Sequence, residues 1–248
     1  MSIEIKFEYT NPLAQLYPPV PSRKLMPEWF KTTSQYAAPF DKNLSIAAKE
    51  LNEQQTDHYG TVKKCMPVTD YMTSGYILRN FIDISITREW PTNEENVHIL
   101  TKHSAKVDPI AFHSPNQMPI PGIDPTSFIY KFSGFWTVRT PPGYSCLFYQ
   151  PQYFFEKRFT VLPAIVDTDV FEEPISFPFI WNDKTCNRQD YELEAGLPIV
   201  CAFPFKRDEY THTIEQKNPN VMSKTEMLLR TVLDNMYKTF FHQKKKYD

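Results

Sequence analysis

The chain has 248 residues, with 27 Lys and Arg against 29 Asp and Glu and a formal net charge of −2. This balance lacks the basic surface of a dedicated nucleic-acid-binding domain, so we expect no nucleic-acid partner. Hydrophobic residues make up 41% and charged residues 23%, which is typical of a folded globular protein. No run of about 18 apolar residues occurs and the N-terminus has no apolar signal-peptide core, so we expect no membrane association.

Glycine is scarce and proline abundant, with 6 Gly and 22 Pro, while aromatic residues reach 15%. Phosphate-binding loops need several glycines in one turn, and none of the six glycines forms such a loop. Proline and aromatic residues suit short strands joined by rigid, extended connections. The composition therefore favours an all-β protein.

The first 31 residues predict an extended arm that carries the first strand. Polarity alternates strictly over residues 3–9, which indicates a half-buried strand. The prolines of 17–21 require an extended path, either along the protein's own surface or as a PxxP ligand for a partner. Residues 26–31 predict one short helical turn, and 44–55 either a short helix or a polar excursion.

Strand patterns dominate the middle of the chain and recur at intervals of roughly 8–15 residues, as in sandwiches and barrels. Five prolines make residues 108–127 a predicted long loop. We therefore predict a mainly β protein, a jelly-roll or double-stranded β-helix-like sandwich, folded as a single β domain over residues 1–248. The predicted strands are 62–68, 75–78, 82–86, 97–100, 128–132, 135–138, 146–149, 159–162, 165–166, 175–181 and 197–203.

The C-terminal region predicts one amphipathic helix over residues 223–243. Ser223 and Glu226 have the spacing of a capping box, and Met222 and Met227 could form the flanking hydrophobic staple. A lone helix of this length is marginal in water, so its apolar stripe is expected to be buried against the β core or another subunit. The stripe consists of Leu229, Val232, Leu233, Met236 and Phe240.

Metal-ligand patterns are missing from the sequence. The six histidines form no HxH, HxD/E or HExxH motif, so we expect no tightly bound transition metal and no cofactor. The cysteines are far apart, without a CxxC, and we expect all four to be free and at least partly buried. They are Cys65, Cys146, Cys186 and Cys201.

Residues 140–146 (TPPGYSC) predict a sharp, rigid corner between two strands, because Pro141 and Pro142 deny backbone donors and Gly143 permits a positive φ. The corner resembles the second motif of cupins, in which a histidine ligand follows the glycine by three residues. Cys146 stands at that place, so the resemblance implies a double-stranded β-helix without a cupin metal site. Ser145 lacks the second glycine of a nucleophile elbow.

Asp167 and Asp169 form the best carboxylate cluster. On an extended segment they share a face and could bind a divalent ion or share a proton. The alternative is a turn in which the carboxylates accept backbone N–H groups. Together with residues near the corner, they make up a candidate ligand-binding mouth of the β core, with two tryptophans as walls that would suit sugar stacking. The candidate site residues are Lys131, Trp136, Arg139, Tyr144, Ser145, Asp167, Asp169 and Trp181.

Several strings between residues 20 and 210 resemble an uncharacterised family of marine tailed phages, notably cyanophages, and some bacteria. The resemblance implies a jelly-roll-like core and a phage source, and it brings no established activity or catalytic residue. The strings are 27–31 (PEWFK), 64–67 (KCMP) with Asp70, 73–76 (TSGY), 140–145 (TPPGYS), 166–169 (VDTD), 176–179 (SFPF) with Trp181, 196–198 (GLP) and 204–207 (PFKR).

Two functions remain open at this point. The first is a non-enzymatic phage structural, accessory or interaction protein, found in the virion or the host cytoplasm, with protein partners or self-association. The alternative is an enzyme or small-ligand binder, for instance of a sugar, that uses the mouth of a metal-free, cupin-like core. Regulators of host proteins and proteins with nucleic-acid partners form a smaller third class.

Overall fold

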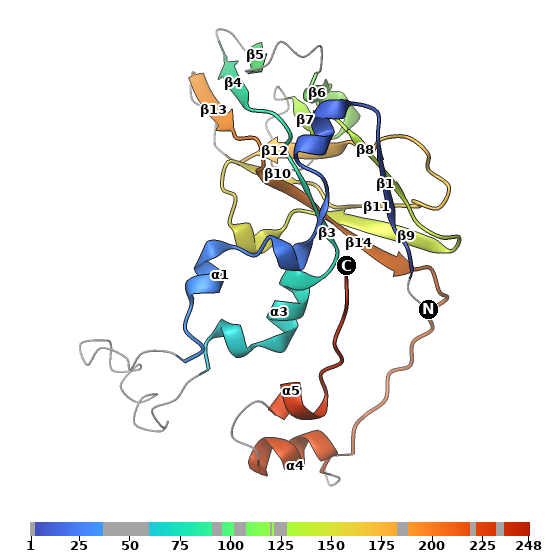
Figure 1. Ribbon diagram of the computed structural model, residues 1–248. Helices are drawn as coiled ribbons and strands as arrows, with labels where there is room; N and C mark the ends of the chain where they lie inside the picture. Colours follow the sequence, from blue (N-terminus) through green and yellow to red (C-terminus); the bar gives the residue numbers. More distant parts are fainter. Residues whose placement is uncertain are drawn as a thin grey trace, which may run out of the picture. The chain divides into compact units, whose positions relative to one another are not determined.

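The chain folds into two compact units in the computed structural model (Figure 1). The β unit comprises residues 1–25 and 75–208, and the helical unit comprises residues 26–74 and 209–248. The chain thus enters the helical unit twice, and each unit is described by itself below. The residues described are 3–36, 60–90, 96–101, 108–119, 121, 128–182, 188–218, 222–231 and 236–248.

Within the described ranges, the β unit is built from short strands that pair antiparallel in four sheets. Their orders are β1-β8, β10-β12-β7-β6, β11-β9-β14-β3-β2 and β13-β4-β5. The mainly β class predicted from the sequence is confirmed, and the jelly-roll connectivity stays a prediction. The strands are β1 (Lys6–Tyr9), β2 (Val20–Pro21), β3 (Tyr76–Arg79), β4 (Ile84–Glu89), β5 (Asn96–Thr101), β6 (Ile110–His113), β7 (Ile129–Phe132), β8 (Trp136–Arg139), β9 (Tyr144–Tyr149), β10 (Phe159–Val161), β11 (Ala164–Val166), β12 (Phe177–Trp181), β13 (Arg188–Leu193) and β14 (Pro198–Lys206).

Aromatic side chains fill the core of the β unit. Phe179 is fully buried and stacks on Phe132, with ring centroids 4.3 Å apart. Phe159 packs edge-on against Phe132 at 5.2 Å. Trp181 stacks on Tyr191 of β13 at 3.9 Å, which joins two of the sheets. Buried aromatic pairs of this kind contribute both area and specific geometry.

The N-terminal arm lies along the β unit's own surface, which is one of the two arrangements left open by its sequence. Phe7 of β1 is opposite Val138 of β8, and Val20 of β2 is opposite Ile77 of β3. Between them is the 3-10 helix η1 (Pro12–Leu16), which Asn11 caps by accepting the N–H of Leu13 at 3.0 Å. The described part of the unit also contains the 3-10 helices η2 (Ser22–Lys24), η4 (Pro115–Gln117) and η5 (Gln152–Phe154).

The helical unit contains only short helices among its described residues. The strand predicted over 62–68 is wrong, because Pro67 stands in the first turn of a helix, where its missing N–H costs nothing. The predicted turn at 26–31 is confirmed as α1, and the segment 44–55 lies outside the described residues. The helices are α1 (Glu28–Thr32), η3 (Val62–Lys64), α3 (Met66–Thr73), α4 (Lys224–Thr231) and α5 (Met236–Phe240).

The capping box at the start of α4 is confirmed. Glu226 accepts the N–H of Ser223 at 2.7 Å, and the Ser223 hydroxyl accepts the N–H of Glu226 at 3.2 Å. The predicted helix to residue 243 is too long, since α5 ends at Phe240. Phe240 is 48% exposed, so the predicted burial of the stripe is wrong at this position. The side chains of 229 and 232–233 lie outside the described part of the chain.

Past α5, the chain turns back onto α3. The Asp70 carboxylate lies 3.0 Å from Nε2 of His242 and 2.6 Å from Nζ of Lys245. Burial raises the pKa of Asp70, but hydrogen bonds from Lys245 and His242 outweigh it and lower the pKa overall. These contacts hold residues 242 and 245 against α3.

Three of the four cysteines are described, and all three are free thiols. Cys146 and Cys201 are buried, and burial raises the pKa of the Cys146 thiol to about 11. Cys65 is exposed, so the expectation of burial is wrong there, because it sits between η3 and α3 rather than in a strand. Cys186 lies outside the described residues.

Candidate functional site

The corner at residues 140–146 is a tight turn between β8 and β9, as predicted. Gly143 adopts φ +84°, and a Cβ atom added there would meet no atom within 4 Å. Two strands flank the start of β9: the register of β11 pairs Val166 with Cys146, and that of β14 pairs Lys206 with Tyr144. The residues that follow β11 and those that follow β14 therefore lie next to the turn.

Arg207, the residue after β14, is the centre of this arrangement. Its N–H donates to the carbonyl of Gly143 at 2.8 Å, which prolongs the ladder by one step. Its guanidinium forms a bidentate pair with Asp169, Nη1 to Oδ1 at 2.9 Å and Nη2 to Oδ2 at 2.5 Å. The same Nη1 reaches Asp167 at 3.2 Å and the carbonyl of Tyr144 at 3.1 Å. We call Arg207, Asp167, Asp169 and Ser145 the Arg207 corner.

Asp169 is the most constrained acid of the corner. Its side chain is 5% exposed, and its Oδ2 accepts the N–H of Gly143 at 2.8 Å in addition to Arg207. The hydrogen bond from Arg207 first, and that from Gly143 second, lower the pKa of Asp169 to about 2. A carboxylate that accepts a backbone N–H at a turn is the second of the two alternatives predicted for 167–169.

Ser145 is buried beneath the two acids. Its hydroxyl donates to Oδ1 of Asp167 at 2.7 Å and accepts from Arg207 at 2.9 Å. A nucleophilic serine must reach its substrate and be deprotonated by a base. A fully buried hydroxyl that is hydrogen-bonded on both sides instead locks the turn in place.

Two threonines support the corner from below. The hydroxyls of Thr140 and Thr168 lie 2.7 Å apart, and that of Thr140 also donates to the carbonyl of Tyr144 at 3.1 Å. Thr168 is fully buried and contacts Sγ of Cys146 at 3.5 Å. Every polar group of this layer has a partner, as buried polar groups require. The corner therefore fixes the end of β14 rigidly to the start of β9.

The eight predicted site residues divide into two groups. Tyr144, Ser145, Asp167 and Asp169 come together at the corner, while the other four make separate contacts. Arg139 pairs with Glu8 at 3.3 Å and Glu172 at 2.9 Å. Lys131 lies on β7, opposite Pro178 of β12, and Trp136 and Trp181 are buried core residues.

Arg207 is not among the eight site residues predicted from the sequence, although it is the last residue of the string PFKR at 204–207. The sequence held one signal for it: Arg207 directly follows a strand, and the acidic cluster of Asp167 and Asp169 also follows a strand. Among the described residues, no group of three His, Cys, Asp or Glu side chains could hold a metal ion.

A small cavity lies inside the β unit. Its volume is about 30 Å³, and its lining includes Trp136, Phe132 and Ile199. A water molecule needs roughly 10–15 Å³ by this measure, whereas pockets for small ligands span about 300–1,000 Å³. The cavity therefore accommodates one or two water molecules, and a sugar ring does not fit.

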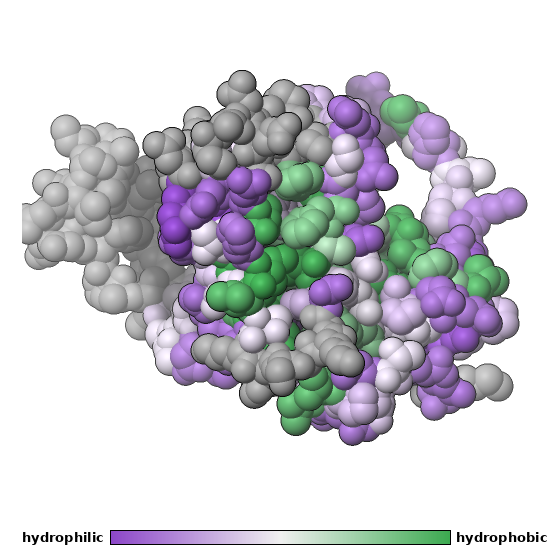
Figure 2. All heavy atoms as spheres, turned by 90° about the horizontal axis from the view of Figure 1, so that it is seen from above, coloured by the Kyte–Doolittle hydropathy of each residue, from purple (hydrophilic) through white to green (hydrophobic). Residues whose placement is uncertain are grey.

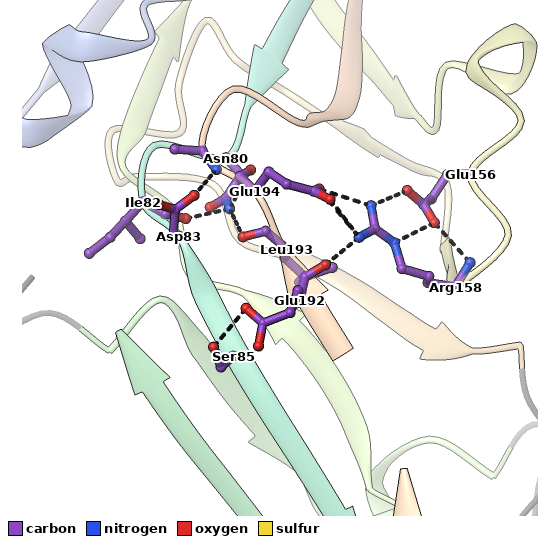
Figure 3. A network of polar contacts seen from close by, with 10 residues as sticks. Asn80, Ile82, Asp83, Ser85, Glu156, Arg158, Glu192, Leu193 and Glu194 are labelled. Carbon is purple, nitrogen blue, oxygen red and sulfur yellow. Dashed lines mark hydrogen bonds and ion pairs between the residues drawn. The ribbon is translucent and has the colours of Figure 1, made fainter. Parts of the chain in front are cut away.

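A second polar cluster joins β4, β13 and the loop before β10 (Figure 3). Arg158 donates to both carboxylate oxygens of Glu156, at 2.9 and 2.7 Å, and to the main-chain carbonyl of Glu192. The buried amide of Asn80 donates to the carbonyls of Ile82 at 2.5 Å and Leu193 at 3.2 Å. These bonds satisfy main-chain carbonyls where strands end, which is a structural role.

Arg88 is a buried cation on the inner face of β4. Its Nε donates to the Tyr130 hydroxyl at 3.1 Å and its Nη1 to Oε1 of Gln189 at 3.1 Å. The guanidinium also lies over the Trp90 ring, 4.6 Å from its centroid. Aromatic faces stabilise a guanidinium in this way, so these contacts hold the core side of the β4–β13 sheet together.

Large apolar side chains are exposed at many places among the described residues. Figure 2 shows apolar side chains gathered between polar ones on the face seen from above. Leu100 of β5 and Phe112 of β6 are exposed, and both strands lie at the top of Figure 1. Exposed apolar side chains also occur in residues 209–218, which we call the connector. Every connector residue is exposed, Tyr210 at 83% and Ile214 at 92%.

Comparisons with protein-family models and with curated proteins find no match for this chain. Among the helices that the structure describes, none is long and apolar enough to cross a membrane.

Proposed function

We propose that the protein is a non-enzymatic structural or interaction protein whose partner-binding element is the connector. The observation that carries this proposal is the exposure of Tyr210 and Ile214 within a segment in which every residue is exposed. Apolar side chains in water contribute nothing to folding, since their stabilisation comes from burial. In an extended chain, residues 210 and 214 point to the same side, and exposed apolar side chains that share a face are typical of surfaces that another protein covers.

The Arg207 corner supports the same function. It anchors the chain two residues before the connector begins, through the bidentate pair with Asp169 and the N–H bond to Gly143. Ordering a flexible segment on binding costs conformational entropy, and a rigid starting point lowers that cost. The corner is thus a fixed attachment point for a binding segment.

The resemblance to tailed-phage proteins gives the proposal its setting. A structural or accessory role there places the protein in the virion or in the host cytoplasm, with protein partners or a second copy bound at the connector. The Trp136 cavity is far smaller than a sugar site and Ser145 is buried, so neither of these two features supports the ligand-binding alternative.

The experiment has two steps. Mass spectrometry of purified virions, from the phage that encodes the chain, is expected to detect the protein. Limited proteolysis then compares the isolated protein with the particle. The connector is expected to be cut in the isolated protein and protected in the particle. Absence from the particle would overturn the structural version of the proposal, and equal cleavage at the connector in both samples would overturn its role as the partner-binding element.

A further inference from the structure

We infer that the connector's partner is the same segment of a second copy of this chain. Residues 210–214 of the two copies pair as antiparallel strands about a two-fold axis through His212. This inference rests on the proposed function, because it names the partner of the same segment. Two-fold homodimers are the commonest oligomers, and their interfaces are self-complementary.

The sequence of the segment is symmetric in character. It reads Tyr210-Thr211-His212-Thr213-Ile214, with His212 in the middle. In antiparallel register about His212, Tyr210 of one copy lies opposite Ile214 of the other, and Thr211 lies opposite Thr213. Aromatic with β-branched and threonine with threonine are both favourable cross-strand pairs. Four of the five residues are also β-branched or aromatic, the types enriched in strands.

Alternation gives the paired segments a shared apolar face. In an extended chain, Tyr210, His212 and Ile214 point to one side, and the two threonines point to the other. Two copies about the axis therefore bring two tyrosines and two isoleucines together. Both side chains are exposed in the single chain, Tyr210 at 83% and Ile214 at 92%.

The backbone of this segment is available for pairing. Residues 209–214 belong to no strand or helix, and none of them donates or accepts a main-chain hydrogen bond within the described part of the chain. An unpaired extended segment presents a row of N–H and C=O groups to another strand. Pairing with a second copy would satisfy these groups.

Charges at the two ends limit the ribbon to five residues. In the register centred on His212, Glu209 lies opposite Glu215, so like charges face each other at both ends. A two-stranded ribbon of this length is marginal by itself. We therefore expect pairing that depends on concentration and becomes strong where an assembly holds the copies close together.

The first test is a cross-link at the axis. His212→Cys is introduced into the full chain carrying Cys65→Ser and Cys186→Ser, which removes the exposed thiol and the one outside the described residues. Opposed residues have Cα atoms roughly 4.5–5.5 Å apart, within disulfide range. The matched control is Gln216→Cys, whose two copies would be about 27 Å apart in this register.

Mild oxidation is expected to give at least about tenfold more disulfide-linked dimer for His212→Cys than for Gln216→Cys. Equal yields at both positions, or no dimer at either, would overturn the self-pairing. Protection of the connector in the particle would then still support the proposed function with a different protein as the partner.

The second test strengthens the pairing instead of weakening it. Glu215→Lys places a cation opposite Glu209 at both ends of the ribbon, in place of two facing like-charge pairs. Sedimentation velocity is therefore expected to show dimerisation roughly three- to tenfold tighter. The control is the double variant Glu209→Lys with Glu215→Lys, in which lysine faces lysine at both ends. Its dimerisation is expected not to be tighter than that of the native chain. A gain that persists in the control would overturn the proposed register.

Discussion

The β unit and the helical unit are held together by different forces. The β unit has a continuous core of buried aromatic and aliphatic side chains. Among the described residues of the helical unit, the buried large apolar side chains are Phe30 and Met72. The helical unit relies on polar contacts instead, such as Asp70 with Lys245 and Lys63 with the carbonyl of Lys31 at 2.6 Å.

This difference has a thermodynamic consequence. Burial of apolar area is the dominant stabilising contribution in folding, while a partly exposed ion pair contributes at most about 1 kcal/mol. The β unit is therefore expected to set the global stability, and the helical unit to open locally at a lower free energy.

The largest effect is expected in the aromatic core. Phe179→Ala removes a fully buried ring that stacks on Phe132, and should lower the free energy of unfolding by about 3–5 kcal/mol. Urea unfolding followed by tryptophan fluorescence measures this. Ile165→Thr on β11, 63% exposed, is the control and should change stability by less than about 0.5 kcal/mol. Similar losses for the two variants would contradict the assignment of the core.

Alanine substitutions at Gly134 and Gly143 test steric crowding and backbone strain independently. A Cβ atom at Gly134 would lie 2.4 Å from the carbonyl oxygen of Ile175, so Gly134→Ala must displace main chain. At Gly143 the space is open, and Gly143→Ala meets only the cost of a positive φ, roughly 1–2 kcal/mol. Thermal unfolding should therefore show the larger loss for Gly134→Ala. The reverse order would show that the turn at the Arg207 corner is tighter than described.

The sequence predicted β4 well and missed β13, although the two strands pair with each other. Alternation of Ile84 and Ile86 with polar residues is a strong signal for a half-buried strand. In β13 the inner face includes the polar Gln189, which bonds to Arg88, so the apolar alternation is weakened there. The strand predicted over 62–68 failed for a different reason, since its few apolar residues fit a helix equally well once Pro67 occupies the first turn.

The candidate site was also only partly predictable. Asp167 and Asp169 are two residues apart and follow a strand, so their proximity could be inferred locally. Arg207 lies 38 residues beyond Asp169 in the chain, and only the pairing of β11 and β14 on either side of β9 brings it there. Strand order is a non-local property that periodicity does not reveal, and the same holds for the return of His242 to α3.

The Arg207 corner predicts a pH dependence of the β unit. The pKa of Asp169 is about 2 in the folded protein, below its ordinary value of 3.8, so the ionised carboxylate stabilises the fold. This contribution is fully present above about pH 4 and is lost as the pH falls towards 2. Asp169→Asn should therefore be less stable than the native chain at pH 6, and the difference should close by about pH 2.

Unfolding curves of both proteins across this pH range give the measurement. Glu173→Gln, which removes an exposed carboxylate outside the corner, is the matched control. A gap between the native chain and Asp169→Asn that stays constant from pH 6 to pH 2 would show that Arg207 does not stabilise the ionised form.

The smallest effect is expected at Asp70, where the comparison of the two units is sharpest. Asp70→Asn removes the charge that holds Lys245 and His242, and should raise amide hydrogen exchange over residues 236–248 several-fold. Exchange in β9 and β14 should stay unchanged, because their protection depends on the apolar core. Glu28→Gln is the matched control, since its pair with Lys31 is more exposed, with side chains 76% and 54% accessible. If exchange in the β strands rises together with that of the C-terminal residues, the two units unfold as one, and the polar contacts of α3 contribute to global stability.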